Sequence, residues 1–185
     1  TVKPVMDKNI PVYIKNTFKI KNTGTLISVN SDSNATVKGI THINKIALLT
    51  IEGSGMIGVP GFSKKLFEEI YNNNINIIMI TQASSEHSIC IGIQESEAVQ
   101  AKKLVDNAFK YEIENKILNP CKIEEKLSII ALVGDKMKNH QGISGKMFSA
   151  LGKNNINVKA ISQGSSERNI TAVIKEKDVK KALNT

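Results

Sequence analysis

The sequence predicts an α+β fold of two similar β-α-β-β-α-β units, the first inserted in the second. The leading observation is an internal repeat: a shift of 81 residues aligns 46–95 with 127–176 without a gap and gives 18 identities in 50 positions. Each copy also places short apolar runs and amphipathic stretches in the order of a ferredoxin-like unit. Two copies indicate two like domains, because a solenoid needs about three or more repeats.

The first copy supplies every element of such a unit. The apolar run Ile46–Ile51 predicts a buried strand, and apolar residues at helical spacing after it predict a helix that ends near Asn73. The expected elements are, in order, a strand 46–51, a glycine-rich loop 53–61, a helix to about 73, strands 75–81 and 88–93 around a turn at 84–86, a helix capped by Ser96, and an edge strand 117–123 containing Pro120.

The second copy repeats this order from Leu127 and stops early. Its helix begins near Ile143, its strands cover 158–162 and 170–175, and Asp178 caps a helix that the sequence leaves short at Thr185. It therefore lacks a fourth strand, while an apolar strand near the N-terminus lacks a partner. We expect an N-terminal segment 1–44 whose strand 10–16 completes the second unit, a first unit at 45–124, and a second unit at 125–185 that is truncated at its last helix.

Composition and charge exclude several classes of protein. The net charge is +8, from 25 basic and 17 acidic residues, but Arg168 is the single arginine. Arginine is preferred for phosphate and base contacts, so we expect no nucleic-acid partner. No run of about 18 apolar residues is present, which argues against a membrane span. Two cysteines and no signal peptide suggest a cytoplasmic protein, and the start at Thr1 suggests a piece of a longer chain.

Three short motifs suggest other chemistry and fit it poorly. Gly53–Gly58 has dinucleotide-binding spacing, but Gln82 stands where an acidic residue should hold a ribose. Gly142–Met147 resembles a phosphate loop but lacks its first glycine and its magnesium-binding hydroxyl. His87 and Cys90 have metal-like spacing, yet two residues do not make four ligands, and we expect no metal site.

The polar residues that return in both copies are the best candidates for a binding site. Gln82-x-Ser84-Ser85-Glu86 recurs as Gln163-x-Ser165-Ser166-Glu167. Turn chemistry can explain the serines, but it does not explain a glutamine at the end of a strand. The neighbouring loop precedes a helix, where free backbone N–H groups and the helix dipole favour a carboxylate. The loop and the glutamine together predict a site for a small zwitterion.

These blocks resemble the paired ACT domains of aspartokinase, most of all those of threonine-sensitive bifunctional aspartokinase–homoserine dehydrogenases. The likeness rests on two units with Gly-x-x-Gly loops, on Ile80–Glu86 and Ile161–Glu167, and on Ile14–Thr17 with Gly24–Ile27, which resembles the segment after the kinase domain. It covers nearly the whole chain. In that family the first ACT domain is inserted in the second, which agrees with the unpaired-strand argument.

The resemblance implies a regulatory role. ACT domains of aspartokinase bind an end-product amino acid and inhibit the phosphorylation of aspartate, and they associate as homodimers or higher homo-oligomers. The parent kinase domain would use ATP and Mg, whereas this chain would be non-catalytic and need no cofactor. The effector-binding residues that the family implies, with the repeated polar block, are Met56, Ile57, Gly58, Gly61, Asn76, Ile77, Gln82, Ser84, Ser85, Glu86, Met137, Asn157, Gln163 and Ser165.

The identity of the effector depends on one position of the second strand. Lysine-sensitive relatives place an acid there, whereas this chain has Ile78 and Lys159. An ammonium facing Ile78 would lack a partner, and an unpaired buried charge is costly. We therefore expect L-threonine, with lysine as the alternative effector and a dimerisation module without ligand as the alternative function.

Overall fold

The computed structural model describes residues 2–28, 35–82 and 87–185, which form two compact units, Thr1–Ala35 and Thr36–Thr185. The first unit holds a short helix, α1 (Lys3–Met6), and a two-stranded antiparallel sheet of β1 (Val12–Ile14) and β2 (Thr25–Ile27). None of its described residues is buried, and Phe18 is 97% exposed. The described part of this unit therefore has no hydrophobic core of its own.

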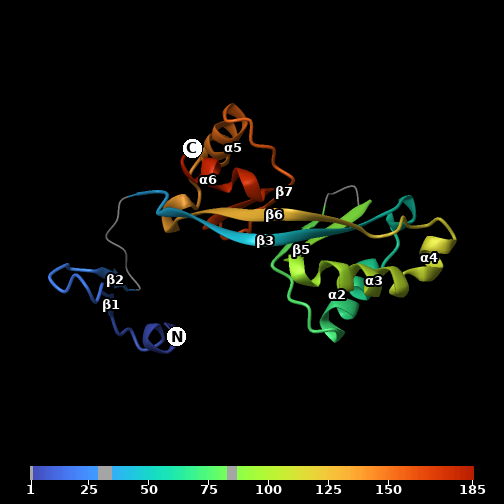
Figure 1. Cartoon of the computed structure of the whole chain (residues 1–185), viewed down its shortest axis with the longest axis horizontal. Helices are drawn as coiled ribbons and strands as arrows, with labels where there is room; N and C mark the ends of the chain where they lie inside the picture. Colours follow the sequence, from blue (N-terminus) through green and yellow to red (C-terminus); the bar gives the residue numbers. More distant parts are fainter. Residues whose placement is uncertain (1, 29–34, 83–86) are drawn as a thin grey trace. The chain divides into compact units, whose positions relative to one another are not determined.

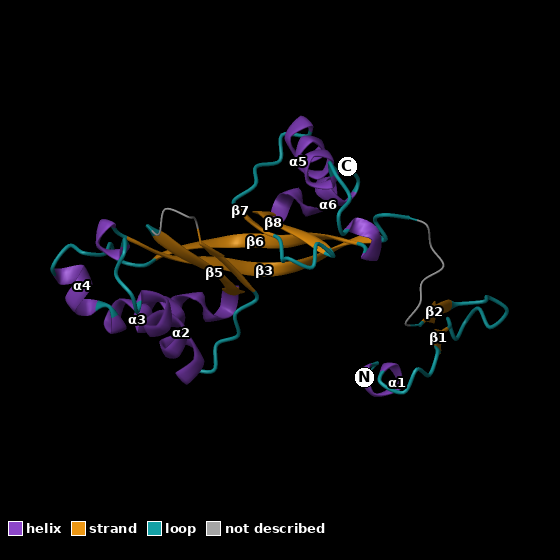
Figure 2. Ribbon diagram, turned by 180° about the vertical axis from the view of Figure 1, so that it is seen from behind, coloured by secondary structure: helices purple, strands orange, loops and turns teal. Residues whose placement is uncertain are grey.

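The second unit is built on one six-stranded antiparallel sheet with the strand order β4-β5-β3-β6-β8-β7. Helices α2 and α3 lie on one side of the long strands β3 and β6, and α5 and α6 lie on the other (Figures 1 and 2). The bounds are β3 (Gly39–Glu52), α2 (Phe62–Asn72), β4 (Met79–Gln82), β5 (Ser88–Gln94), α3 (Ala98–Ala108), α4 (Lys110–Glu114), β6 (Lys122–Val133), α5 (Ile143–Lys153), β7 (Ala160–Ser162), β8 (Asn169–Lys175) and α6 (Val179–Leu183), with short 3-10 turns at Ser54–Met56, Glu95–Glu97, Asp135–Met137 and Glu176–Asp178.

The strand order contains two ferredoxin-like units that share their two longest strands. The end of β3 pairs with β5 and, through Leu48–Thr50, with the start of β6. The end of β6 pairs with β8 and, through Ile129–Val133, with Gly39–Ile43 at the start of β3. Each long strand is thus the first strand of one unit and the last strand of the other. The predicted fold class, including the insertion of the first unit in the second, is confirmed.

The strand that completes the second unit differs from the predicted one. Residues 10–16 were expected to complete it, but Val12–Ile14 pairs with Thr25–Ile27, and Gly39–Ile43 takes that place in the sheet. This part of the prediction is wrong, and the boundary at residue 44 falls inside β3. Gly39–Ile43 takes this place because it is continuous with the part of β3 that belongs to the first unit, so that one strand serves both units.

The described residues of the second unit form three hydrophobic clusters that hold it together. One lies between α2, α3 and the first half of the sheet and includes Leu66, Ile91 and Phe109. A second lies under α5 and α6. The third contains side chains of both repeats, among them Leu48 and Ile129, and lies on the sheet faces that the helices leave free. The two repeats therefore pack against each other as well as sharing strands.

Both shared strands contain a bulge where they pass from one repeat to the other. Lys45 in β3 and Lys126 in β6 have positive φ angles of 58° and 57°, and the register of the β3–β6 ladder shifts beside Lys45. Beside the first bulge, Ser128, which is fully buried, donates a hydrogen bond to Asn44 Oδ1 at 2.9 Å. Beside the second, the Lys126 N–H donates to Glu95 Oε2 at 3.3 Å. Both bulges are therefore fixed by side chains.

Smaller differences from the predicted elements concern element ends. β4 contains four residues, whereas a strand over 75–81 was expected, because Ile75 packs into the first core before the sheet begins. Only the start of β6 replaces the predicted strand 117–123. Ser96 does not cap α3, since a 3-10 turn brings Glu97 to the N-cap position. Asp178 is at the N-cap of α6 but makes no capping hydrogen bond.

Phe109 is expected to be among the side chains on which folding depends most. It is 1% exposed, and its ring is stacked with that of Phe62, with centroids 6.0 Å apart. The variant Phe109→Ala should lose about 3–5 kcal/mol of unfolding free energy, because it leaves a large cavity in the first core. Tyr111→Ala, whose ring is 70% exposed, should change it by less than about 0.5 kcal/mol. Urea unfolding measures both, and similar losses in the two variants would contradict the packing.

The bulge lysines provide a second test of the fold. A left-handed backbone costs a side chain with a Cβ about 1–2 kcal/mol, and most for a β-branched residue. Lysine already bears this cost and branching at Cβ adds to it, so Lys45→Val and Lys126→Val should destabilise the chain by about 1–2 kcal/mol, whereas glycine at the same positions should be neutral or stabilising by up to about 1 kcal/mol. Lys175→Val is the control, because this residue lies in the ordinary strand β8. Thermal unfolding in which valine and glycine behave alike would argue against the bulges.

Candidate functional site

The first candidate site is the loop that joins β3 to α2. Its glycines let the chain pass close to neighbouring segments, since a Cβ at Gly53 would collide with the carbonyl oxygen of Ile117. Gly58 and Gly61 adopt φ angles of 66° and 108°, which favour glycine. Gly61 is the N-cap of α2 and supplies no capping side chain. Among the described residues no side chain caps the first turn of α2, which leaves its backbone N–H groups without such a partner there.

This loop forms one wall of a cavity of about 510 Å³ whose opposite wall is the end of β4 with part of β5. Met56 and Ile89, both buried, form its apolar floor. Gln82 and Ser63 add an amide and a hydroxyl at the edge. The full lining is Met56, Gly58, Val59, Pro60, Gly61, Phe62, Ser63, Gln82 and Ile89. The cavity thus offers apolar walls with a few polar groups, as small-molecule sites do.

The charge around the cavity favours an anionic group at the helix end. The first turn of α2 carries no acidic residue, and Lys64 and Lys65 follow Ser63. Uncapped N–H groups and the positive end of the helix dipole favour a carboxylate there. A molecule with a carboxylate, a short side chain and a polar group would meet complementary groups in this cavity.

Beneath the cavity wall, an aromatic and ionic cluster fixes the start of α2. Lys65 Nζ lies 4.7 Å from the centroid of the Phe109 ring and 2.6 Å from Glu112 Oε1. Burial is the largest single influence on the Glu112 carboxyl and acts to raise its pKa, but the hydrogen bond from Lys65, a backbone hydrogen bond and the charge of Lys65 together outweigh it, and the pKa is lowered. Because Phe62 both lines the cavity and stacks on Phe109, this cluster connects the cavity to the first core.

The structure brings together only part of the predicted residue set. Met56, Gly58, Gly61 and Gln82 line the cavity. Ile57 is 49% exposed, Asn76 is exposed, and Ile77 packs on the first core, so these three lie elsewhere. Ser84, Ser85 and Glu86 lie outside the described residues. Sequence reasoning missed Phe62 and Ile89, because both appeared as ordinary core residues, and Ser63, because a serine in the first turn of a helix is common.

In the second copy, two of the corresponding groups make hydrogen bonds within the chain. Glu167 Oε2 accepts a hydrogen bond from the Asn139 N–H at 2.6 Å, and Ser144 Oγ donates a weaker one to Gln163 Oε1 at 3.4 Å. Met137 is buried in the second core, and Asn157 and Ser165 are exposed. In this copy Gln163 therefore contacts its own helix α5, whereas Met137, Asn157 and Ser165 do not gather around it.

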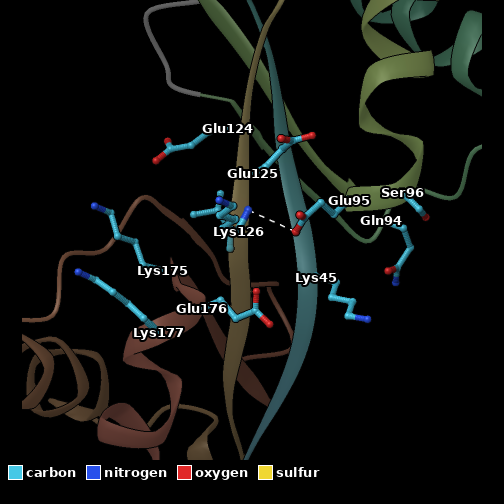
Figure 3. A pocket seen from close by; sticks show the side chains of 11 residues that line it. Lys45, Gln94, Glu95, Ser96, Glu124, Glu125, Lys126, Lys175, Glu176 and Lys177 are labelled. Carbon is cyan, nitrogen blue, oxygen red and sulfur yellow. Dashed lines mark hydrogen bonds between the residues drawn. The ribbon is translucent and has the colours of Figure 1, made fainter.

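A larger cavity, of about 1090 Å³, lies where the two repeats meet (Figure 3). Lys45, Lys126, Lys175 and Lys177 line it together with Glu95, Glu124, Glu125 and Glu176, and Leu127 is the one apolar side chain among the described residues of its lining. Its charges balance, so it offers no net charge for an ion, although the aliphatic parts of these side chains form much of its surface. It contains none of the predicted site residues.

Neither cysteine thiol is activated as a thiolate nucleophile. Burial raises the pKa of Cys121 to about 12 and also raises that of Cys90. Within 2–28, 35–82 and 87–185, no three His, Cys, Asp or Glu side chains come together as metal ligands. In the same part of the chain, every helix is too short or too polar to cross a membrane.

Comparison with known proteins identifies the repeated unit. A family model described as the ACT domain matches residues 49–109 and 130–185. The chloroplastic bifunctional aspartokinase/homoserine dehydrogenase 1 of Arabidopsis thaliana is 40% identical over 189 residues, which cover 99% of this chain and 21% of that protein. The bifunctional enzyme of Haemophilus influenzae is 40% identical over 175 residues, with 94% and 22% covered. The chain spans about a fifth of the length of these relatives.

Solved structures of aspartate kinases contain a region with a similar fold. The aspartate kinase of Clostridium acetobutylicum superimposes with a TM-score of 0.85 at 27% identity, covering 98% of this chain and 42% of that one. Aspartokinase III of E. coli in complex with lysine and aspartate gives a TM-score of 0.73 at 21% identity, covering 98% and 39%. At the lower identity the likeness shows the fold alone.

The Lys65–Glu112 ion pair predicts a specific response to acid. Because the folded pKa of Glu112 lies below its ordinary value of 4.5, the pair stabilises the fold above that value, and the stabilisation is lost as pH falls through the folded pKa. Glu112→Gln should remove less than about 1 kcal/mol at pH 7, since the Lys65 side chain is 41% exposed and screened by solvent. Its loss of stability between about pH 5 and about pH 3 should also be smaller than that of the wild type.

The matched control is Glu114→Gln, whose carboxylate is 64% exposed and lies 3.8 Å from Lys110. This variant should follow the wild type at every pH. Urea unfolding at several pH values provides the measurement, and an acid response of Glu112→Gln that is identical to that of the wild type would disprove the role of the ion pair.

Proposed function

The chain belongs to the ACT-domain family, and from this premise we propose that it is the effector-binding regulatory module of an aspartate kinase. The observation that carries the proposal is the cavity between the Gly53–Gly61 loop and Gln82, whose groups complement a small amino acid. The 40% identity over 99% of the chain to a segment of bifunctional aspartokinase/homoserine dehydrogenases supports the choice of parent enzyme. In such a parent, binding of an end-product amino acid here inhibits the kinase domain.

We favour L-threonine as the effector because of the cavity lining. Among its described residues none is acidic, so the ε-ammonium of lysine would have no carboxylate partner. The hydroxyl of threonine can be met by Gln82 or Ser63, and its methyl group by Met56 or Ile89. This modifies the expectation from sequence, in which Ile77 formed the methyl pocket. Lysine is the alternative, and it is present in the complex of E. coli aspartokinase III with lysine and aspartate.

The site residues carried over from the family are proposed with unequal weight. In the first copy, Met56, Gly58, Gly61 and Gln82 line one cavity and are the core of the proposal. In the second copy, Gln163 is the principal candidate, because it occupies the position that Gln82 holds in the repeat. The parent kinase domain would supply ATP and Mg, and this chain is proposed to be a non-catalytic part of a cytoplasmic enzyme.

A dimerisation module without ligand is the second candidate function. It is favoured by the outer strands of the sheet, β4 and β7, which carry the half-exposed side chains of Ile80 and Ile161. Unpaired edge strands are ready sites for pairing with a second copy. A homodimer is also compatible with effector binding, so the ligand experiment decides between the two functions.

The ligand experiment is a calorimetric and thermal-shift series with threonine, lysine, methionine and valine. Threonine should bind best and raise the unfolding temperature, because a ligand that binds only the folded state stabilises it. Gln82→Ala should weaken threonine binding about ten-fold or more, the effect of a lost buried hydrogen bond of roughly 1–3 kcal/mol. The matched control, Gln94→Ala, replaces a glutamine outside this cavity and should bind threonine normally.

Two outcomes would contradict the proposal. Tighter binding of lysine than of threonine would show that the effector is wrong. If none of the four amino acids binds and the chain is a dimer in sedimentation, the assembly function would replace the regulatory one.

A further inference from the structure

The second repeat contains a cavity of about 320 Å³ that lies between α5, α6 and the sheet. Its walls are mainly apolar and include Ile130, Leu151 and Ala182, which belong to the second hydrophobic cluster. Solvent reaches these walls, since Ile40, which also lines the cavity, is 38% exposed. An apolar cavity destabilises a fold, and an exposed apolar surface is a site where another group can bind.

An aromatic ring occupies the corresponding place in the first repeat. The shift of 81 residues aligns Ile143 and Lys146, which line the cavity, with Phe62 and Lys65. In the first repeat both of these side chains contact Phe109. Its ring stacks on that of Phe62, with centroids 6.0 Å apart, and Lys65 Nζ lies 4.7 Å from its centroid. The second repeat therefore has a cavity where the first has a buried aromatic side chain.

The lengths of the helices explain this difference. Helix α3 has 11 residues and is followed directly by Phe109, whereas α6, which aligns with the start of α3, has five. Thr185 lines the cavity and aligns with Leu104 of α3. Phe109 lies five positions after Leu104, so its counterpart would be the fifth residue after Thr185. A helix that continued α6 would bring this residue to the cavity.

The charges at the cavity indicate what should follow the aromatic residue. In the first repeat, Glu112 lies three positions after Phe109 and pairs with Lys65 at 2.6 Å. In the second repeat, Lys146 forms no ion pair within the described part of the chain. His140 also lines the cavity, and none of the described lining residues is acidic. The cavity thus suits an aromatic side chain with an acidic residue one helical turn later.

We propose that this cavity is the docking site for a helical segment that prolongs α6 in the parent polypeptide and carries an aromatic residue followed by an acidic one. The inference rests on the proposed function for the parent, because the relatives are longer than this chain, which spans 21% of the Arabidopsis enzyme. Thr36 and Val37, the first residues of the second unit, also line the cavity. The docked segment therefore joins the polypeptide after Thr185 to the residues that precede β3.

The test compares this chain with the same chain prolonged by about ten residues of its natural continuation. The prolonged chain should unfold at a temperature at least about 5 °C higher, because an aromatic side chain fills the cavity. Replacement of that aromatic residue by alanine should remove most of the gain. Lys146→Glu should remove part of it by repelling the acidic residue, whereas the control Lys138→Glu, at an exposed lysine outside the cavity, should leave it unchanged.

A second arm tests the cavity with a sequence already known to fill its counterpart. A copy of Val105–Glu114 appended after Thr185 should raise the unfolding temperature in the same way, and the amides of Val179–Leu183 should exchange at least several-fold more slowly in both prolonged chains. No gain in either chain would overturn the docking site. A gain with the copy alone would overturn the assignment of the occupant to the natural continuation.

The same prolonged chain separates this inference from the proposed function. The stability and exchange measurements need no effector, and the first cavity, which contains Gln82, is not involved. If threonine binds neither form of the chain while the natural continuation stabilises it, the proposed function fails and the docking site stands. If threonine binds both forms and the natural continuation stabilises neither the fold nor α6, the docking site fails alone.

Discussion

The structure depends on two strands that each belong to both repeats. Strands β3 and β6 run side by side through the middle of the sheet, and each begins in one ferredoxin-like unit and ends in the other. Within each of these strands, the alternation of apolar and polar side chains has to shift by one residue between the two units. The reason is that one half of the strand packs against α2 and α3 and the other half against α5 and α6, which lie on opposite sides (Figures 1 and 2). The bulges at Lys45 and Lys126 provide that change, and the Ser128–Asn44 hydrogen bond and the Lys126–Glu95 contact hold them. The third core follows from the same crossing, since it gathers side chains from both halves of the sheet.

Much of this could be predicted from sequence, because the repeat carries long-range information that a single copy lacks. The agreement of the two copies indicated the element order, the fold class and the loop before α2. The identity of the last strand could not be predicted, because Val12–Ile14 has a more apolar pattern than Gly39–Ile43. The real position of that strand depends on the continuity of β3, which hydrophobic pattern does not encode.

The residues of the candidate site could also be predicted only in part. Gln82 and the loop glycines could be found, because a residue type that returns at the same place in both copies needs a reason beyond packing. Phe62 could not, because the repeat has Ile143 at that position, and Ser63 has the ordinary explanation of a serine in a first helical turn. The Glu167–Asn139 hydrogen bond also could not be found, because its donor is a backbone N–H, which every residue type except proline provides.

The shared strands also constrain how such a chain can assemble. Each unit completes its sheet with a strand that is continuous with the other unit, which is the arrangement of a domain-swapped dimer joined into one polypeptide. Residues 39–43 pair with residues about 90 positions later, so the second unit cannot close until the whole first unit and most of the second have been synthesised. Pairings of such long sequence separation form slowly, because the entropy of loop closure opposes them. The first repeat can fold during synthesis, whereas the start of β3 remains without its partner, the end of β6, until that strand has been made. For the same reason, neither repeat can be separated as a complete domain by cutting the chain at one position.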